Sequence, residues 1–456
     1  MSKRLAVILA AGKGTRMKSD LYKVLHPVNG LAMIEHVVDA VQAAKVDQIV
    51  TVVGFGAQAV KELLGEKSQY ALQEEQLGTG HAVQQAKSIL AGEDGATLVI
   101  CGDTPLISSQ TINQLFDFHE QSGAKGTVLT AQFDNPFGYG RIIRQTDGTV
   151  SHIVEEKDAN DVERLVTEIN TGTYVFDNQL LFEMLDLVTN DNAQGEYYLP
   201  DVIGLLQERG HLIAAHVMAD ADEALGVNDR LALAEAGRLM SRRINRKHML
   251  NGVTLINPAT TYIEAQVQIG PDTVIEGGVS LKGQTRIGSH AYIGAHSEIC
   301  DSQIGDQVQI SQSVIEKSTV ERAATIGPFA HLRPNSHLMD EVHIGNFVEV
   351  KNSTIGKGTK SGHLTYIGDV DLGKDINIGC GTIFVNYDGK YKHRSTVGDQ
   401  AFIGCDTKIM SPVEIGPRTV TAAGSVITDD IPEDAMGIAR SRQTNIPNYY
   451  PKFINK

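Results

Sequence analysis

The spacing of hydrophobic and polar positions along the chain changes near residue 250. Before it, short apolar runs alternate with stretches whose apolar residues recur at helical spacing. Strands alternating with helices of this length predict an α/β domain with a Rossmann-like parallel sheet covered on both faces. The predicted strands are Leu5–Leu9, Gln48–Val53, Thr97–Cys101 and Thr127–Ala131, and the predicted helices are Ile34–Ala44, Val60–Leu64 and His81–Leu90.

Beyond residue 250 the chain repeats itself in steps of six. An aliphatic residue followed by Gly occurs thirteen times between positions 269 and 416, mostly at spacings of 6, 12 or 18. Such hexapeptide repeats form a left-handed parallel β-helix, in which three hexads make one triangular coil and the aliphatic residues point inward. Each coil buries its interior only by stacking on its neighbours. We therefore expect residues 251–456 to form one β-helix domain.

A basic segment, residues 230–250, lies between the two patterns. Its apolar residues have helical spacing, and Asn228 stands where a helix cap is expected. A solvated connecting helix is the favoured interpretation, and a phosphate-binding helix is the alternative. The sequence thus predicts a domain at 1–229, a linker helix at 230–250 and a domain at 251–456.

Composition narrows the class of protein. A net charge of −15 without a basic face argues against duplex nucleic-acid binding, although a nucleotide site needs only a few local donors. No run approaches the roughly 18 apolar residues of a membrane span, and the apolar run near the start leads into a Gly-rich loop rather than a cleavage site. The four cysteines match no zinc or disulfide pattern and are typical of reduced thiols. We expect a cytoplasmic protein without nucleic-acid or membrane partners.

A Gly-rich loop follows the first predicted strand. Residues 9–16 read LAAGKGTR, in which small residues let backbone N–H groups approach phosphates while Lys13 and Arg16 supply positive charge. The pattern is neither a Walker A motif nor GxGxxG. From the loop alone, a nucleotide site and an ordinary tight strand-to-helix connection are equally good interpretations.

The segments around this loop carry a family resemblance. The stretch LAAGKGTRMKSDLYKVLHPVNG resembles the signature of sugar-nucleotide pyrophosphorylases, although Tyr22 stands where that family usually has Pro. Six further matches follow in order: LQEEQLGTG, CGDTPL, FGYGR, VEEKDA, EINTG and GVND. With the hexapeptide half, this order is very similar to the family of bacterial bifunctional N-acetylglucosamine-1-phosphate uridyltransferases/glucosamine-1-phosphate acetyltransferases, over almost the whole chain.

That resemblance implies the synthesis of UDP-N-acetylglucosamine for cell-wall peptidoglycan and lipopolysaccharide. Acetyl-CoA would acetylate glucosamine 1-phosphate, and the product would then attack the α-phosphorus of UTP and release pyrophosphate. It also implies a homotrimer with active sites between subunits.

In the first domain, the resemblance implies a Mg²⁺ ion held by Asp103 and Asn228, since Mg²⁺ takes few protein oxygens beside phosphate oxygens. Without the resemblance, Asp103 would be interpreted as a helix cap. Lys23 would bind substrate phosphates. A base-reading Gln has a physical logic, because one amide matches the paired donor and acceptor of uracil. The nucleotide-binding and uracil-reading set is Leu9, Ala10, Ala11, Gly12, Arg16, Lys23, Gln73, Gly78 and Thr79, and the sugar-binding set is Gly140, Glu155, Asn170 and Thr171.

In the second domain, the resemblance implies that His363 is the base that deprotonates the sugar amine, because the pKa of histidine lies near working pH. Glu349 would orient or charge-stabilise the site. The implied substrate-binding residues are Arg333, Lys351, Tyr366 and Asn377, and the implied acetyl-CoA-binding residues are Cys380, Asn386, Tyr387, Cys405, Ala423 and Arg440.

Two of these positions depart from the family pattern, which has Ala at 380 and Ser at 405. A thiol is a weaker hydrogen-bonding group than a hydroxyl, so the contribution of position 405 stays open. A covalent acetyl-Cys405 route is a minor alternative to direct transfer.

Three other functions remain to be weighed. The chain would be a single-activity pyrophosphorylase if its β-helix were only a scaffold, and a nucleotide sensor if it bound UTP without turnover. A carbonic anhydrase needs a three-His zinc site, for which the spacing of His331, His337, His343 and His363 gives no convincing pattern.

Overall fold

The computed structural model describes residues 3–146, 148–192 and 194–454. The chain divides into two compact units, Met1–Met240 and Ser241–Lys456. Their boundary falls inside helix α8 (Arg230–Leu250), which covers the segment predicted as a linker helix. Within the described ranges, no helix is both long and apolar enough to cross a membrane.

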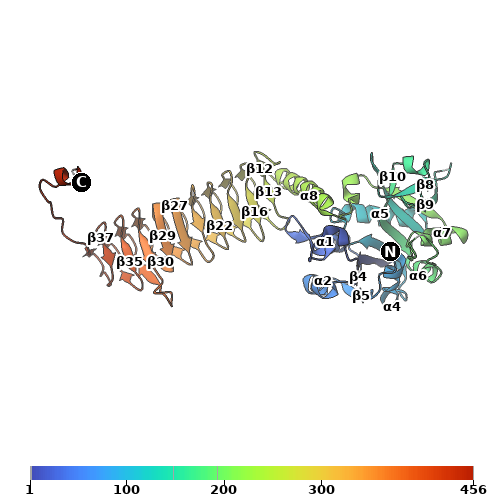
Figure 1. The fold of residues 1–456 in the computed structure, drawn as a ribbon, viewed down its shortest axis with the longest axis horizontal. Coiled ribbons are helices and arrows are strands. Elements are labelled where there is room, and N and C mark those ends of the chain that lie inside the picture. Colours follow the sequence, from blue (N-terminus) through green and yellow to red (C-terminus); the bar gives the residue numbers. More distant parts are fainter. Residues whose placement is uncertain (1–2, 147, 193, 455–456) are drawn as a thin grey trace. The chain divides into compact units, whose positions relative to one another are not determined.

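The first unit, coloured blue to green in Figure 1, is built on a nine-stranded sheet. Its main strands lie in the order β11-β7-β10-β6-β1-β4-β5. All four predicted strands and the parallel pairing of β1 with β4 and β6 are confirmed. The expectation of a wholly parallel sheet is wrong at β10, which runs antiparallel to β6 and β7, because the β8–β9 hairpin rather than a crossover helix precedes it. The strands are β1 (Lys3–Ala10), β4 (Gln48–Val53), β5 (Gln69–Leu72), β6 (Gly95–Cys101), β7 (Gly126–Gln132), β8 (Gly140–Arg144), β9 (Val150–Val154), β10 (Glu168–Asp177) and β11 (Ile213–Val217).

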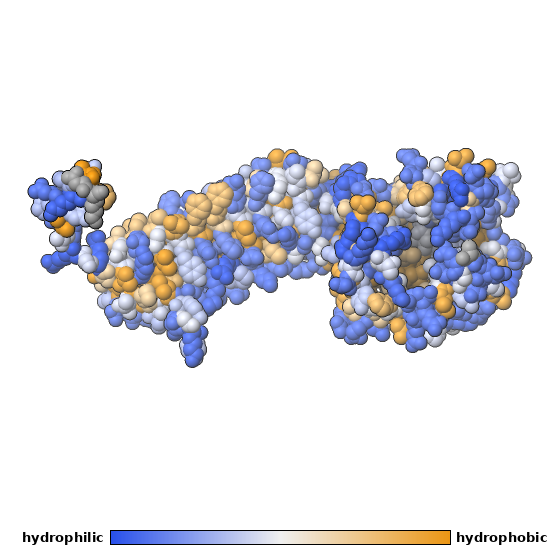
Figure 2. Space-filling model, in the orientation of Figure 1, coloured by the Kyte–Doolittle hydropathy of each residue, from blue (hydrophilic) through white to orange (hydrophobic). Residues whose placement is uncertain are grey.

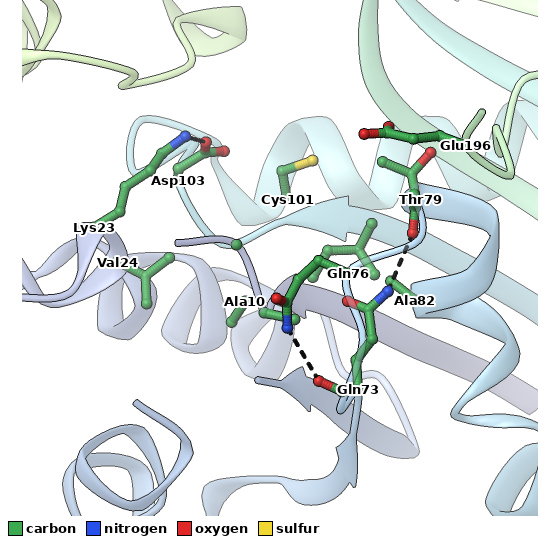
Figure 3. A pocket seen from close by; sticks show the side chains of 14 residues that line it. Ala10, Lys23, Val24, Gln73, Gln76, Thr79, Ala82, Cys101, Asp103 and Glu196 are labelled. Carbon is green, nitrogen blue, oxygen red and sulfur yellow. Dashed lines mark hydrogen bonds and ion pairs between the residues drawn. The ribbon is translucent and has the colours of Figure 1, made fainter. Parts of the chain in front are cut away.

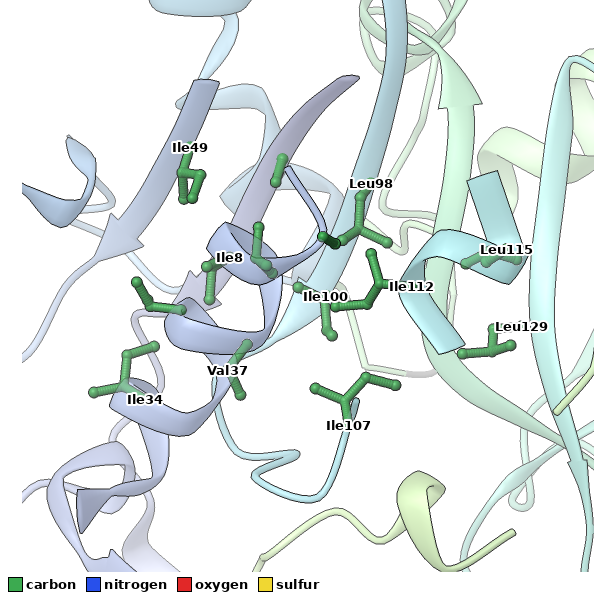
Figure 4. Packing of buried hydrophobic residues seen from close by; sticks show 14 of the residues in the cluster. Ile8, Ile34, Val37, Ile49, Leu98, Ile100, Ile107, Ile112, Leu115 and Leu129 are labelled. Atoms are coloured by element: carbon green, nitrogen blue, oxygen red, sulfur yellow. The ribbon is translucent and has the colours of Figure 1, made fainter. Parts of the chain in front are cut away.

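Helices cover both faces of this sheet, as predicted. On one face, α1 (Met33–Ala43), α2 (Ala57–Leu64) and α5 (Ser109–Ser122) contribute to a buried cluster that Figure 4 shows between Ile8 and Ile100 of the sheet and Ile34 and Ile112 of the helices. The other face is covered by α3 (Thr79–Gln84), α4 (Lys87–Leu90), α6 (Asn178–Leu185) and α7 (Asp201–Glu208). The single helix predicted at 81–90 is thus two short helices.

The second unit is a parallel β-helix. Strand β12 (Thr254–Leu255) pairs with β15 (Val274–Ile275), which pairs with β18 (Tyr292–Ile293), and the strands of successive coils stack in parallel in this way. The aliphatic residues of the repeats are buried inside, as predicted; Ile275, Ile293 and Ile310 are fully buried.

Two long strands mark the middle of this β-helix. Strand β27 (His343–Lys351) pairs in parallel with β29 (Lys360–Gly368) along almost its whole length. After them come β31 (Asn377–Ile378), β34 (Phe402–Ile403) and β37 (Val420–Thr421), stacked in that order. Residues 386–394 leave the ladders as a loop between β32 (Ile383–Val385) and β33 (Ser395–Val397).

Candidate active sites

The carboxyl ends of β1 and β6 open into a cavity of about 260 Å³ (Figure 3). Loops after parallel strands commonly carry ligand sites, because the strand ends converge at one edge of the sheet. The cavity brings together most of the residues implied for the nucleotide: Leu9, Ala10, Ala11, Gly12, Lys23, Gln73, Gly78, Thr79 and Asp103.

Lys23 connects the two implied metal ligands. Its ammonium forms an ion pair with Asp103 and donates a hydrogen bond to Oδ1 of Asn228 at 2.7 Å. Arg16 donates to the same Asn228 oxygen at 2.9 Å. Two hard oxygen ligands are therefore directed at one positive charge, and this donor set fits a Mg²⁺ ion that also takes phosphate oxygens.

The expectation that Asn228 caps α8 is wrong. Asp229 takes that role, since its Oδ1 accepts from the backbone N–H of Ala232 at 2.9 Å. The side chain of Asn228 is instead held by Lys23 and Arg16. Lys13 lies apart from this group, with its Nζ 5.8 Å from the ring centre of Phe55.

At the other end of the cavity, Gln73 is buried and its amide is fixed in place. Its Nε2 donates to the carbonyl of Gly78 at 3.2 Å and lies 3.0 Å from Nδ1 of His81. Gly78 has φ +114°, and a Cβ there would lie 2.5 Å from the carbonyl oxygen of Tyr197. No other residue fits this backbone, so the position of Gln73 depends on glycine.

A second cavity of about 240 Å³ adjoins the first and shares Leu9 and Thr79 with it. Glu155 and Asn170 line this cavity. Burial, together with the charge of Asp158, raises the pKa of Glu155. Asn170 Nδ2 donates to the hydroxyl of the buried Tyr174 at 2.7 Å, which fixes its orientation.

The two other implied sugar residues lie close by. Gly140 pairs with Asn170 across β8 and β10, and a Cβ there would lie 3.2 Å from Oε1 of Glu155. Thr171 does not line the described cavities, and its hydroxyl donates to the carbonyl of Leu129 at 2.7 Å.

Two residues that the sequence interpretation missed line both cavities. Glu196 comes from a segment outside every quoted motif, so no signal marked it. Cys101 begins the CGDTPL motif, and burial, reinforced by Asp103, raises the pKa of its thiol to about 12. Gln76 and Val24 line the first cavity alone.

In the β-helix, a cavity of about 510 Å³ carries a concentration of positive charge. Arg333 and Lys351, both implied by the sequence, line it, and so do Lys392 and Arg394, which the sequence interpretation missed. Arg333 Nη1 donates to Oε1 of Glu349 at 2.8 Å, and this hydrogen bond raises the pKa of the guanidinium. The pocket fits a phosphate group.

A buried carboxylate, Asp369, lies at the base of this cavity. Its oxygens accept from Lys351 Nζ at 3.2 Å, from Asn352 Nδ2 at 2.5 Å and from Asn386 Nδ2. Burial alone would raise the pKa of Asp369, but these hydrogen bonds outweigh it and hold the pKa below its usual value. Asn386 also donates to the hydroxyl of Tyr366 at 3.3 Å, so one network joins both implied residues to Lys351.

The exposed side chain of His363 stands in a file of residues on one corner of the β-helix. Asn346 and His363 are register partners on neighbouring coils. The register of the following strands places Cys380, Cys405 and Ala423 at the same position on the next three coils. Four residues implied for catalysis or acetyl-CoA binding thus follow one another coil by coil.

Asn377, Tyr387 and Arg440 lie outside this file, outside the cationic cavity and outside the hydrogen-bond networks of Arg333 and Asp369. Asn377 is exposed on β31, stacked between Lys360 and Phe402. The Tyr387 hydroxyl donates to the carbonyl of Gly389 at 2.7 Å within the loop, and Arg440 is exposed beyond the last strand. In the described ranges, no group of three or more His, Cys, Asp or Glu side chains could hold a metal.

Comparison with known proteins agrees with this division of the chain. Residues 5–231 match the nucleotidyl transferase family, and residues 394–429 match the bacterial transferase hexapeptide family of six repeats. The hexapeptide match and the parallel stacking together identify a left-handed β-helix.

Full-length relatives are similar over both units. The bifunctional protein GlmU of Pediococcus pentosaceus is 56% identical over 98% of this chain and 96% of its own length. That of Bacillus velezensis is 56% identical over 100% of both chains. A solved structure of a putative glucose-1-phosphate thymidylyltransferase from Bacillus anthracis matches more loosely, with 21% identity and a TM-score of 0.44 over 52% of this chain and 94% of that one.

Proposed function

This chain belongs to the family of bifunctional GlmU proteins, and from that premise we propose how its residues divide two transfer reactions. The protein is a bifunctional transferase that makes UDP-N-acetylglucosamine by uridyl transfer and acetyl transfer, with nucleotide and acetyl-CoA substrates. We propose in addition the roles of individual residues, a bound Mg²⁺ ion, a trimeric assembly and a cytoplasmic location. The alternatives of a scaffold β-helix and a nucleotide sensor have no comparable support.

In the first unit, N-acetylglucosamine 1-phosphate attacks the α-phosphorus of UTP and pyrophosphate leaves. Lys23 and Arg16 neutralise phosphate charge, which lowers the barrier for an anionic nucleophile. Asp103 and Asn228 would hold Mg²⁺, which supplies further charge neutralisation and aligns the phosphates when bound. The convergence of Lys23, Asp103 and Asn228 supports this assignment.

Specificity in this unit comes from the two adjoining cavities. The fixed amide of Gln73, with Gly78 and Thr79, reads uracil in the first. Glu155 and Asn170 hold the sugar in the second, beside Gly140.

In the β-helix, His363 accepts a proton from the amine of glucosamine 1-phosphate. The amine then attacks the thioester carbonyl of acetyl-CoA, and the CoA thiolate leaves. Arg333 and Lys351 bind the phosphate of the substrate in the cationic cavity, with Lys392 beside them. Tyr366 and Asn377 position the sugar, and the file from Cys380 to Ala423 faces acetyl-CoA.

The protein acts in the cytoplasm, where UTP and acetyl-CoA are available, and assembles as a homotrimer. Exposed apolar side chains on the β-helix support self-association: Phe329 stacks on Phe347 at 5.6 Å between ring centres, and Leu364 follows on the next coil. Figure 2 shows further hydrophobic surface over its C-terminal coils. A mass of three chains by light scattering is expected, and a monomer would contradict the trimer.

The observation that carries the functional proposal is that each unit has its own cavity lined by a lysine, Lys23 in the first unit and Lys351 in the β-helix. Product analysis with partial substrate sets tests it. Glucosamine 1-phosphate and acetyl-CoA alone should give N-acetylglucosamine 1-phosphate, and that product with UTP and Mg²⁺ should give UDP-N-acetylglucosamine. If the acetylated sugar phosphate had to be supplied ready-made, the assignment of the β-helix would be wrong.

A further inference from the structure

Cys380 and Cys405 lie next to each other on neighbouring coils. The pairing of Asn377 with Phe402 and of Ile378 with Ile403 continues to this position. The backbone N–H of Asp406 donates to the carbonyl of Cys380 at 2.7 Å, and a Cβ on Gly379 would lie 2.8 Å from the Cα of Cys405. The backbone therefore stacks the two cysteines in register.

Both corners have the same shape, and both thiols are exposed. Gly381 and Asp406, which follow the two cysteines, have left-handed φ values of +77° and +60°. Equivalent corners direct their side chains the same way. Adjacent parallel strands lie about 4.8 Å apart, which falls within the Cα separation that a disulfide spans. No large backbone movement is needed to join these sulfurs.

The other two cysteines lack such a neighbour. Cys101 ends β6 in the first unit, and its register partner on β1 is Leu9. Cys300 ends β19 (Glu298–Cys300), and its register partners on either side are Lys282 and Glu316. Among the described residues, Cys380 and Cys405 are therefore the one pair of accessible cysteines at register-paired positions of neighbouring coils.

We propose that Cys380 and Cys405 form a reactive thiol pair that small organic disulfides oxidise to an intramolecular disulfide. One thiolate attacks the organic disulfide, which forms a mixed disulfide and releases one thiolate. The second protein thiolate attacks the protein-side sulfur, the Cys380–Cys405 bond forms, and a second small thiolate leaves. The two protons of the protein thiols pass to solvent, and the organic disulfide takes up the two electrons.

The pair lies between His363 and Ala423 in the corner file. The expected effect of oxidation on acetyl transfer rests on the proposed function. If that file faces acetyl-CoA, the disulfide between Cys380 and Cys405 alters the surface beside His363. Oxidation then lowers acetyl transfer and leaves uridyl transfer in the other unit unchanged. The disulfide itself forms whether or not the proposed function is right, so the two claims fail separately.

The test treats the full-length protein with oxidised glutathione, blocks free thiols with an alkylating agent and maps its peptides by mass spectrometry without reduction. The expected product is a cross-linked peptide joining positions 380 and 405, about 2 Da lighter than the two reduced peptides together. Dithiothreitol should reverse it. Acetyl transfer and uridyl transfer are measured on the same samples, each relative to the reduced protein.

Variants separate the pair from other thiols. Cys300→Ser should keep the cross-link and the loss of acetyl transfer. Cys380→Ala and Cys405→Ser, each compared with its own reduced form, should lose the cross-link and give only a mixed disulfide at the remaining position. Phenylarsine oxide, which bridges two nearby thiols with loss of water, serves as a second probe on the unmodified protein and needs no variant to fold.

Each outcome decides the proposal. A cross-link at 380–405 with arsenical bridging supports it. Mixed disulfides at the two positions without a cross-link overturn it, and so does arsenical bridging without oxidation by glutathione. A cross-link that leaves acetyl transfer intact keeps the thiol pair but overturns its effect on the acetyltransferase. If acetyl transfer is absent from the reduced protein, the proposed function fails while the mapped cross-link still tests the pair.

Discussion

Nδ1 of His363 lies 3.0 Å from Oδ1 of Asn346, its neighbour on the preceding coil. An amide oxygen only accepts hydrogen bonds, so Nδ1 must donate to it. The neutral ring therefore keeps the lone pair of Nε2, which is the atom available to take a proton from a substrate amine. Asn346 thus selects the tautomer that a general base needs.

His363→Ala should lower the rate of acetyl transfer by about 10²- to 10⁴-fold, because it removes the general base. Asn346→Ala should lower it less, since the ring remains but loses its fixed tautomer. Acetyl-CoA cleavage with a thiol reagent measures both, and uridyl transfer on N-acetylglucosamine 1-phosphate is the control. A variant at 363 with wild-type acetyl transfer would disprove the assignment, as would an equal fall in both activities.

Asp369→Asn should raise the KM for glucosamine 1-phosphate about tenfold, because Lys351, Asn352 and Asn386 lose the carboxylate that positions them. The kcat should change less. Removing a negative charge from a phosphate site would by itself strengthen binding, so the direction of the change is informative. An unchanged or lower KM would show that Asp369 does not position these residues. The matched control is Asp375→Asn, which makes the same change at an exposed acid.

Metal removal should separate the two units. A chelator in excess over Mg²⁺ should stop uridyl transfer and spare acetyl transfer, because the proposed metal ligands, Asp103 and Asn228, lie in the first unit, where both contact the Lys23 ammonium. Asp103→Asn should lower uridyl transfer about 100-fold or more. Uridyl transfer that persists in the chelator would refute the metal assignment.

The site residues that lie in short local motifs could be predicted from the sequence. The site residues whose contacts come from a neighbouring coil or a distant segment could not. Lys23, Asp103 and His363 lie in recognisable segments, and the strands around them follow from apolar runs. Asp369 acquires its role from Lys351 on the preceding coil, and no spacing signal marks that contact. Glu196 reaches both cavities from a segment without a motif.

The direction of β10 was beyond prediction for a similar reason. Its apolar pattern is that of any buried strand, and its direction is set by the β8–β9 hairpin. The role of Asn228 was ambiguous in the sequence because an Asn side chain just before a helix can act as its N-cap. In the structure the neighbouring Asp229 caps the helix instead.

The first unit should lose stability as pH falls from about 6.5 towards 4. Burial lowers the pKa of His119 to about 4, and its Nδ1 lies 2.8 Å from the hydroxyl of the buried Thr127. The folded pKa of His119 lies below its unfolded value, so the contribution of the neutral ring to the free energy of unfolding is fully present above about pH 6.5. This contribution is lost as pH falls through the folded pKa, and the loss is about 3 kcal/mol at most.

Urea unfolding at a series of pH values measures this loss. His119→Asn should flatten the slope between pH 6.5 and 4, whereas His211→Asn, at a partly exposed histidine, should keep it. An unchanged slope in the His119 variant would show that another group governs the acid sensitivity.

The most direct test of two independent catalytic units is the mixing of two damaged proteins. Asp103→Asn and His363→Ala are each incubated with glucosamine 1-phosphate, acetyl-CoA, UTP and Mg²⁺, alone and together, and the products are identified by mass spectrometry. The account predicts that Asp103→Asn alone stops at N-acetylglucosamine 1-phosphate, that His363→Ala alone makes neither product, and that the mixture makes UDP-N-acetylglucosamine. If the mixture made no UDP-N-acetylglucosamine while each variant stayed folded, the division of the two reactions between the units would be contradicted.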